Sequence, residues 1–224
     1  MGFFDFLDNV VACAQGVDVE SVIEQQRKWT LESRFKNAMD SYEGVILGSE
    51  IISDLVLYDG DVGYLEKADF KIAGKGRIIF ALKSRAVVSK VKFRSVDSRG
   101  ARALVVVRAP EITFSNCIFD GKNSRNALEA DCPVTLEESI IRNCGDKSNS
   151  RDVVTVVRKP DGRRRSDVSI SNLKMMRCKT EKHLFNVADD LRGSCFVDKC
   201  IAGQGLFCAG GKVTVSEVTV GKGE

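Results

Sequence analysis

The sequence has little of what membrane, secreted and metal-binding proteins need. Its 224 residues include one histidine, one tryptophan and three prolines, and no apolar stretch approaches the roughly 20 residues of a membrane-spanning helix. None of the eight cysteines is spaced as CxxC or as a Cys/His metal motif, so we expect neither a bound metal nor a cofactor. The first residues lack the basic start of a secretory signal, which favours a cytoplasmic location with free, buried thiols.

Charge is nearly balanced overall, with 34 basic and 31 acidic residues, but it is unevenly distributed. Residues 1–50 hold nine acids and four bases and also show apolar residues at helical spacing. We therefore expect a cap of amphipathic helices over residues 1–48 and a second domain over residues 49–224. A membrane-surface anchor is the alternative, but such helices are rich in bases, whereas Asp5 and Asp8 would be repelled by anionic lipid.

From about Ile51 the apolar period changes to two, and one pattern recurs. Two inward-facing residues lie two positions apart, and a second pair with the same spacing begins three positions later. In a strand of period two, this step of three turns the chain while the next side chain stays inward. A second alternating strand separates the copies, for example at Leu104 and Val106. Repetition in one direction is typical of stacked parallel coils. The copies begin at Ala86, Ile112, Val134, Val168, Cys195 and Val213, and the fifth comprises Cys195, Val197, Cys200 and Ala202.

The repeat, with Ser-Asn-Cys at 115–117 and Ser-Asn-Leu at 171–173, resembles the right-handed pectin-lyase-like β-helices from about Ile51 to Val220. The resemblance implies an all-β solenoid, a right-handed parallel β-helix of about seven coils behind an N-terminal α-helical cap. That architecture serves polysaccharide lyases and hydrolases, phage and viral spikes, adhesins and interaction domains, so it does not determine the function. Many relatives stack asparagines at the turn, but such a ladder is absent here, where the positions are Lys90, Asn116, Glu138, Asn172, Lys199 and Glu217.

Catalysis on this fold would need gathered carboxylates, because glycosidases use a carboxylate pair and eliminating lyases an acidic calcium site with a base. No expected outward column holds clustered acids. The best catalytic candidate is a loop group similar to the acids and histidine of polygalacturonase-like enzymes, although that family's basic downstream segment is missing. A solvated turn over residues 188–193 is the reading we favour, with no active site. The candidates are His183, Asp189, Asp190 and Arg192.

A basic loop favours binding instead. The insertion between Val156 and Val168 gathers five bases that would attract phosphate or carboxylate. A solubilising turn is the alternative, and no aromatic residue is interleaved to stack nucleic-acid bases. We predict an anionic partner for this loop through Arg158, Lys159, Arg163, Arg164 and Arg165.

An apolar stripe also favours binding. Ile118, Ile140 and Ile201 are expected in one outward column with Phe196 nearby, and such a stripe needs either an intramolecular cover or a partner. The N-terminal helices could supply the cover; otherwise the stripe is the protein interface. The last coil, with only valines inward, could pair with another chain, so a homo-oligomer is a further hypothesis.

The cysteines are expected to stack as free thiols. The repeat places Cys117 and Cys200 in one inward column, and Cys144 and Cys178 at the same site on neighbouring coils. Stacked coils would bring such residues to about 5 Å from each other. A disulfide is the alternative in an oxidising compartment, but we favour a packed thiol ladder.

The sequence thus predicts a non-catalytic binding protein on a β-helix scaffold, with a protein or an anionic polymer as its partner. A polysaccharide-active lyase or hydrolase, of phage or viral origin, is the alternative. A nucleic-acid-binding protein is the third hypothesis, for which we expect steep salt dependence.

Overall fold

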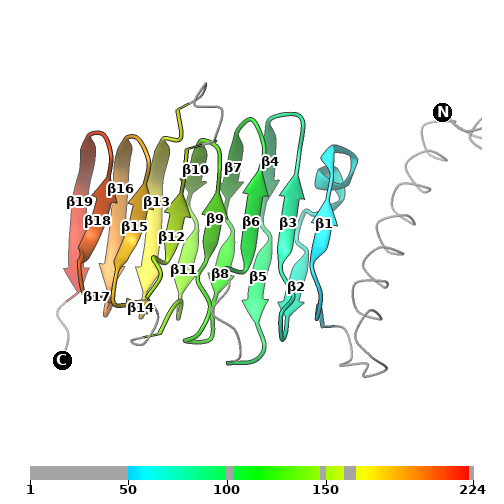
Figure 1. Cartoon of the computed structure of the whole chain (residues 1–224), viewed down its shortest axis with the longest axis horizontal. Coiled ribbons are helices and arrows are strands. Elements are labelled where there is room, and N and C mark those ends of the chain that lie inside the picture. Colours follow the sequence, from blue (N-terminus) through cyan, green and yellow to red (C-terminus); the bar gives the residue numbers. More distant parts are fainter. Residues whose placement is uncertain (1–49, 99–102, 147–149, 159–164, 222–224) are drawn as a thin grey trace, which may run out of the picture.

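The computed structural model describes residues 50–98, 103–146, 150–158 and 165–221. These residues form a parallel β-solenoid of about six turns (Figure 1), one fewer than the seven coils that the sequence predicts. Within them helix is confined to a short 3-10 segment, η1 (Asp59–Tyr64). The helical cap expected over residues 1–48 lies outside the described residues.

Two parallel sheets run the length of the solenoid, and we call the ten-stranded one sheet A and the seven-stranded one sheet B. All the strand pairs are parallel and join one coil to the next. A two-stranded sheet pairs β14 (Lys179–Thr180) with β17 (Ile201–Ala202) at one corner. Sheet B contains β1 (Leu55–Leu57), β3 (Ile78–Ala81), β6 (Val105–Arg108), β9 (Leu128–Ala130), β12 (Val154–Val156), β15 (His183–Val187) and β18 (Gly205–Ala209). Sheet A contains β2 (Asp69–Ile72), β4 (Ala86–Ser89), β5 (Lys92–Ser95), β7 (Ile112–Ser115), β8 (Ile118–Asp120), β10 (Val134–Glu137), β11 (Ile140–Arg142), β13 (Val168–Met176), β16 (Leu191–Asp198) and β19 (Val213–Gly221).

A left-handed residue produces the kink that the step of three predicts. Lys90, Asn116, Glu138 and Asn172 have φ angles of 57, 54, 46 and 51°. The backbone N–H of Asn116 donates to the carbonyl of Glu137 at 2.9 Å, and that of Glu138 to the carbonyl of Ser171 at 2.8 Å. The kinks of successive coils are therefore hydrogen-bonded to one another, although only two of these four residues are the asparagines that tolerate this conformation best.

The copy that the sequence assigns to Cys195 is wrong in register. The structure pairs Val168 with Leu191 and Leu173 with Cys195, so this coil begins at Leu191. Gly193 takes the second inward position with φ 125°, where a Cβ would lie 1.7 Å from the carbonyl oxygen of Ile170. Because glycine is the residue that such a close approach requires, the copy has no apolar residue there for a hydrophobic pattern to detect.

The second strand of one coil is also shifted from its expected register. Ile78 pairs with Val105 and Phe80 with Val107, so these two valines take the inward positions of the strand. Val106 faces outward, whereas Leu104 precedes the strand and is also fully buried. Residues 104–107 are all apolar, and such a run has no alternation from which to choose a face.

Phenylalanines fill the core of the N-terminal coils. Phe70, Phe93 and Phe119 stack in consecutive coils with ring centroids 5.7 and 5.1 Å apart. Phe80 and Phe114 from the two facing sheets meet edge to face at 5.9 Å. Phe93 contacts every other ring of the group, which makes it the centre of this cluster.

We predict that Phe93→Ala lowers the free energy of unfolding by about 3–5 kcal/mol, because the substitution leaves a cavity among aromatic rings. Val87, 62% exposed on the outer surface, supplies the control, and Val87→Ala should change stability by less than about 0.5 kcal/mol. Urea unfolding followed by circular dichroism measures both. Equal effects of the two substitutions would contradict the placement of the core.

We also predict that Glu138→Asn raises stability by about 1 kcal/mol, because asparagine accepts the left-handed conformation more readily than glutamate. The adjacent Glu137 lies in the regular strand β10, where asparagine is disfavoured, so Glu137→Asn should not stabilise. Thermal unfolding of the two variants measures this difference. A more stable Glu137→Asn than Glu138→Asn would contradict the left-handed conformation at Glu138.

Candidate binding face

One outward column of sheet A combines apolar and basic side chains. Successive strand pairs place Ile118 beside Ile140, Ile140 beside Lys174, and Lys174 beside Phe196. Neighbours in such a column lie about 4.8 Å apart. We call Ile118, Ile140, Lys174 and Phe196 the outer column. Ile201, expected in this column, instead lies in β17 beside Lys179 and is 47% exposed there.

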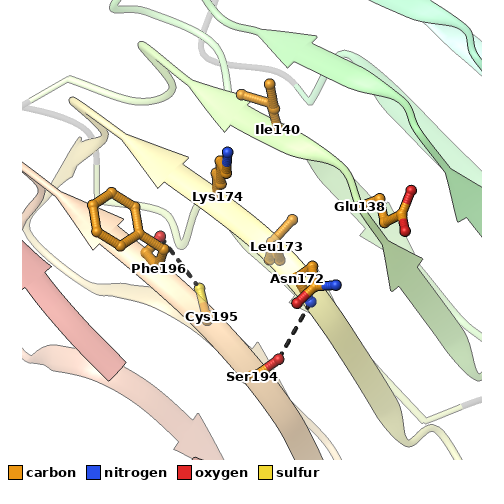
Figure 2. Close-up of a pocket in the computed structure, with 8 residues that line it drawn as sticks. All are labelled: Glu138, Ile140, Asn172, Leu173, Lys174, Ser194, Cys195 and Phe196. Atoms are coloured by element: carbon orange, nitrogen blue, oxygen red, sulfur yellow. Dashed lines mark hydrogen bonds between the residues drawn. The ribbon is translucent and has the colours of Figure 1, made fainter. Parts of the chain in front are cut away.

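A shallow hollow of about 480 Å³ lies over the C-terminal half of the outer column (Figure 2). Ile140, Lys174 and Phe196 line one part of it, and the kink residues Glu138 and Asn172 line another. The side chain of Phe196 is exposed at 39%. Ser194 accepts a hydrogen bond from the backbone N–H of Asn172 at 3.3 Å, which links β16 to β13 beside the hollow. The sheet therefore presents a concave surface rather than a flat one at this point.

The chemistry of the hollow is set by Lys174. Within the described residues Lys174 has no ion pair, and its neighbours in the column are the aliphatic Ile140 and the aromatic Phe196. An ammonium group between apolar side chains suits a ligand that carries an anionic group beside apolar groups. Glu138 also lines the hollow, so its carboxylate would repel a ligand that carries a second negative charge. The sequence predicts an outward position for Lys174 but no binding site there. The reason is the shift in register at Gly193, because the predicted register does not place Phe196 beside Lys174.

The catalytic candidates do not converge. His183 begins β15, whereas Asp189 and Asp190 follow the end of that strand, so the length of the strand, roughly 13 Å, separates His183 from them. The Nδ1 atom of His183 lies 3.1 Å from Asp152 Oδ1, and Asp152 also accepts a hydrogen bond from Asn186 at 2.9 Å. Arg192 donates to Ser169 Oγ at 3.0 Å. His183, Arg192 and the pair of aspartates therefore belong to separate local networks.

The two aspartates instead hold the chain after β15 in place. The backbone N–H of Ser166 donates to Asp189 at 2.6 Å and, together with the Arg158 guanidinium, holds the pKa of Asp189 below its usual value. The backbone N–H of Lys212 donates to Asp190 at 2.7 Å and likewise lowers its pKa. Because a general acid needs a raised pKa, neither carboxyl group is tuned for that role.

Other carboxylates are engaged by bases on the adjacent coil. Three of these pairs are Asp54 with Arg77 at 2.5 Å, Asp69 with Arg94 at 2.5 Å, and Asp120 with Arg142 at 2.7 Å. Among the described residues no three His, Cys, Asp or Glu side chains are grouped so that they could hold a metal ion. The carboxylates thus link coils to one another in this part of the chain.

The basic loop is described only at its ends. Arg158 pairs with Asp189, and Arg165 pairs with Asp190 at 2.6 Å and with Asp167 at 3.3 Å. Lys159, Arg163 and Arg164 lie outside the described residues, and their binding of an anion stays a prediction. The acidic neighbours of Arg158 and Arg165 reduce the charge that these two residues can offer to a ligand.

The thiols form a stack, but its membership differs from the expected one. The pairing of β14 with β17 places Cys178 beside Cys200, and the backbone N–H of Cys178 donates to the sulfur of Cys200 at 3.3 Å. A hydrogen bond with Cys144 raises the pKa of Cys178. Cys200 therefore joins Cys144 and Cys178 rather than the column of Cys117, because of the same register shift at Gly193. Burial raises the pKa of Cys117 to about 11, so the thiolate, its reactive form, is disfavoured.

Comparison of the chain with protein-family models, with curated proteins and with solved structures gives no match. Within the described ranges, no helix has the length and apolar character needed to cross a membrane.

We predict that Asp189→Asn destabilises the protein at pH 7 and that this difference disappears in acid. The pKa of Asp189 is lowered by folding, so its contribution is present above the unfolded pKa of about 3.9 and is lost as pH falls through the folded pKa. Urea unfolding of wild type and variant from pH 7 down to about pH 2 measures the difference. Glu181→Gln, on an exposed turn, is the control. A difference for Asp189→Asn that is independent of pH would contradict this role.

Proposed function

We propose that this chain is a non-catalytic interaction protein that binds its partner through the outer column of sheet A. The observation that carries the proposal is the hollow in which Lys174, without an ion pair among the described residues, lies between Ile140 and the exposed Phe196. The partner that fits is a polypeptide surface with a carboxylate beside apolar side chains. Apolar contact with Phe196 and Ile140 would exclude water from the ion pair and strengthen it.

The carboxylate arrangement supports binding over catalysis. A glycosidase needs two carboxyl groups with different pKa values on either side of a substrate. Asp189 and Asp190 both have lowered pKa values, and their partners are Ser166, Lys212 and two arginines of this same chain. These groups are thus engaged in the solenoid itself. A polysaccharide-active enzyme remains the alternative, and a nucleic-acid-binding protein the third.

We further propose three finer features that the sequence predicts. These are a right-handed coil of the pectin-lyase-like kind, a helical cap over residues 1–48 and a cytoplasmic location with free thiols. The parallel pairing of every coil supports a solenoid of this general kind. The basic loop would add a second contact, through Arg163 and Arg164, for a partner that is itself anionic.

Selection of displayed random peptides against the wild-type protein tests this function. We expect the enriched peptides to carry an acidic residue next to apolar residues. Their binding, measured by fluorescence anisotropy, should weaken at least tenfold on Lys174→Ala and on Phe196→Ala, since central aromatic and charged residues dominate interface energies.

The control for this experiment is Val87→Ala, which changes an exposed apolar residue of sheet A in a different outward column. It should bind the enriched peptides as wild type does. Peptides that lack acidic residues, or that bind all three variants equally well, would contradict the proposed face. Binding of RNA that depends on Arg163 and Arg164 would favour the third hypothesis.

A further inference from the structure

A second hollow, of about 410 Å³, lies where sheet A ends and the chain turns toward sheet B. Three basic residues from three successive coils line it, namely Lys71 of β2, Arg94 of β5 and Lys122, which follows β8. Asp120, Asn123 and Asn143 also line the hollow. We call this hollow the corner basin. It is separate from the outer column and from the basic loop, because it shares no residue with either.

The fold brings these groups together through register and backbone conformation. Lys71 pairs with Arg94 and Arg94 with Asp120 in consecutive strands. Lys122 and Asn123 follow in left-handed conformations, with φ angles of 50 and 60°. The backbone N–H of Asn123 donates to the carbonyl of Asn143 at 2.6 Å, which ties this turn to the next coil. The turn is therefore held in position before any ligand arrives.

The acids near the basin already have partners. Asp120 accepts hydrogen bonds from Arg142 Nε at 2.7 Å, from Asn143 Nδ2 at 3.1 Å and from the backbone N–H of Lys122 at 3.3 Å. Asp69 receives the Nε and Nη2 groups of Arg94 at 2.8 and 2.5 Å. The net charge around the basin is nevertheless positive, because the two carboxylates are outnumbered by four basic side chains, those of Lys71, Arg94, Lys122 and Arg142.

Hydrogen-bond donors remain available on the basic side. The two bonds to Asp69 leave the Nη1 group of Arg94 unused. The ammonium of Lys122 donates to the carbonyl of Val96 and keeps two further N–H groups. Within the described residues Lys71 has no ion pair, and its side chain is exposed at the rim. Donors from three coils therefore face one small volume.

We propose that the corner basin binds a tetrahedral oxyanion, either a phosphate or a sulfate group. Such an anion offers several acceptor oxygens in different directions, which matches donors spaced along three coils about 4.8 Å apart. A carboxylate has two oxygens in one plane and would satisfy fewer of these donors at once. The site takes a free ion or the same group carried on a larger molecule.

Titration of the protein with inorganic phosphate and inorganic sulfate, at constant ionic strength maintained with chloride, tests the proposal. Amide NMR signals of Lys122 and Asn123 should shift saturably with either anion. Lys71→Ala and Lys122→Ala should each weaken the fitted affinity on the order of tenfold, because each removes charge-assisted hydrogen bonds. Lys122→Arg should retain most of it. Methyl phosphate distinguishes the sources: binding as tight as that of phosphate indicates a group carried on a larger molecule, and weaker binding indicates the free ion.

The matched control is Lys83→Ala, which removes an exposed lysine from a different turn and should leave affinity unchanged. Phe196→Ala should also leave the affinity for phosphate and sulfate unchanged, so this test is independent of the outer column. Shifts that do not saturate, or affinities equal in wild type, Lys71→Ala and Lys122→Ala, would overturn the proposal. Circular dichroism of each variant confirms that the fold is retained.

Discussion

Parallel hydrogen bonding of each coil to the next is the constraint on which the rest of this structure depends. It makes the equivalent residue of the neighbouring coil the nearest neighbour of every side chain, so each position becomes a column. Inward columns must then pack like with like, as Phe93 does on Phe70 and Phe119. The left-handed kink residues keep these columns aligned while the strand changes direction.

The same constraint determines what the outer surface can do. Where opposite charges lie on adjacent coils, as with Asp69 and Arg94 or with Asp120 and Arg142, they form ion pairs between coils. Each exposed pair contributes little stability, of order 1 kcal/mol or less, and it engages the carboxylate within the solenoid itself. Where a column mixes apolar and basic residues, as around Lys174, we propose that the surface binds a partner.

Much of the fold could be predicted because the repeat is visible in the spacing of apolar side chains. From Ala86 to Ile170 the predicted inward residues of sheet A match the observed pairing, and the step of three corresponds to a left-handed residue. The prediction failed where side chains carry no signal. Gly193 replaces an apolar residue because of a backbone contact, and residues 104–107 are uniformly apolar.

The candidate sites were harder to predict because they depend on register. Ile118 and Ile140 were placed correctly in one column, but Phe196 joins them only once the coil begins at Leu191. The corner basin depends on left-handed turns at Lys122 and Asn123 that no apolar pattern reports. Nothing in the sequence indicated that His183 would pair with Asp152 rather than with the aspartates beyond β15.

We propose that this solenoid binds a partner without turning over a substrate, and a turnover assay is the direct test. Purified protein would be incubated with a panel of acidic and neutral polysaccharides, with and without calcium, and the release of reducing and unsaturated ends would be measured. We expect no release above that of a heat-denatured control. Release that is abolished by Asp189→Ala or Asp190→Ala would contradict it and establish an enzyme.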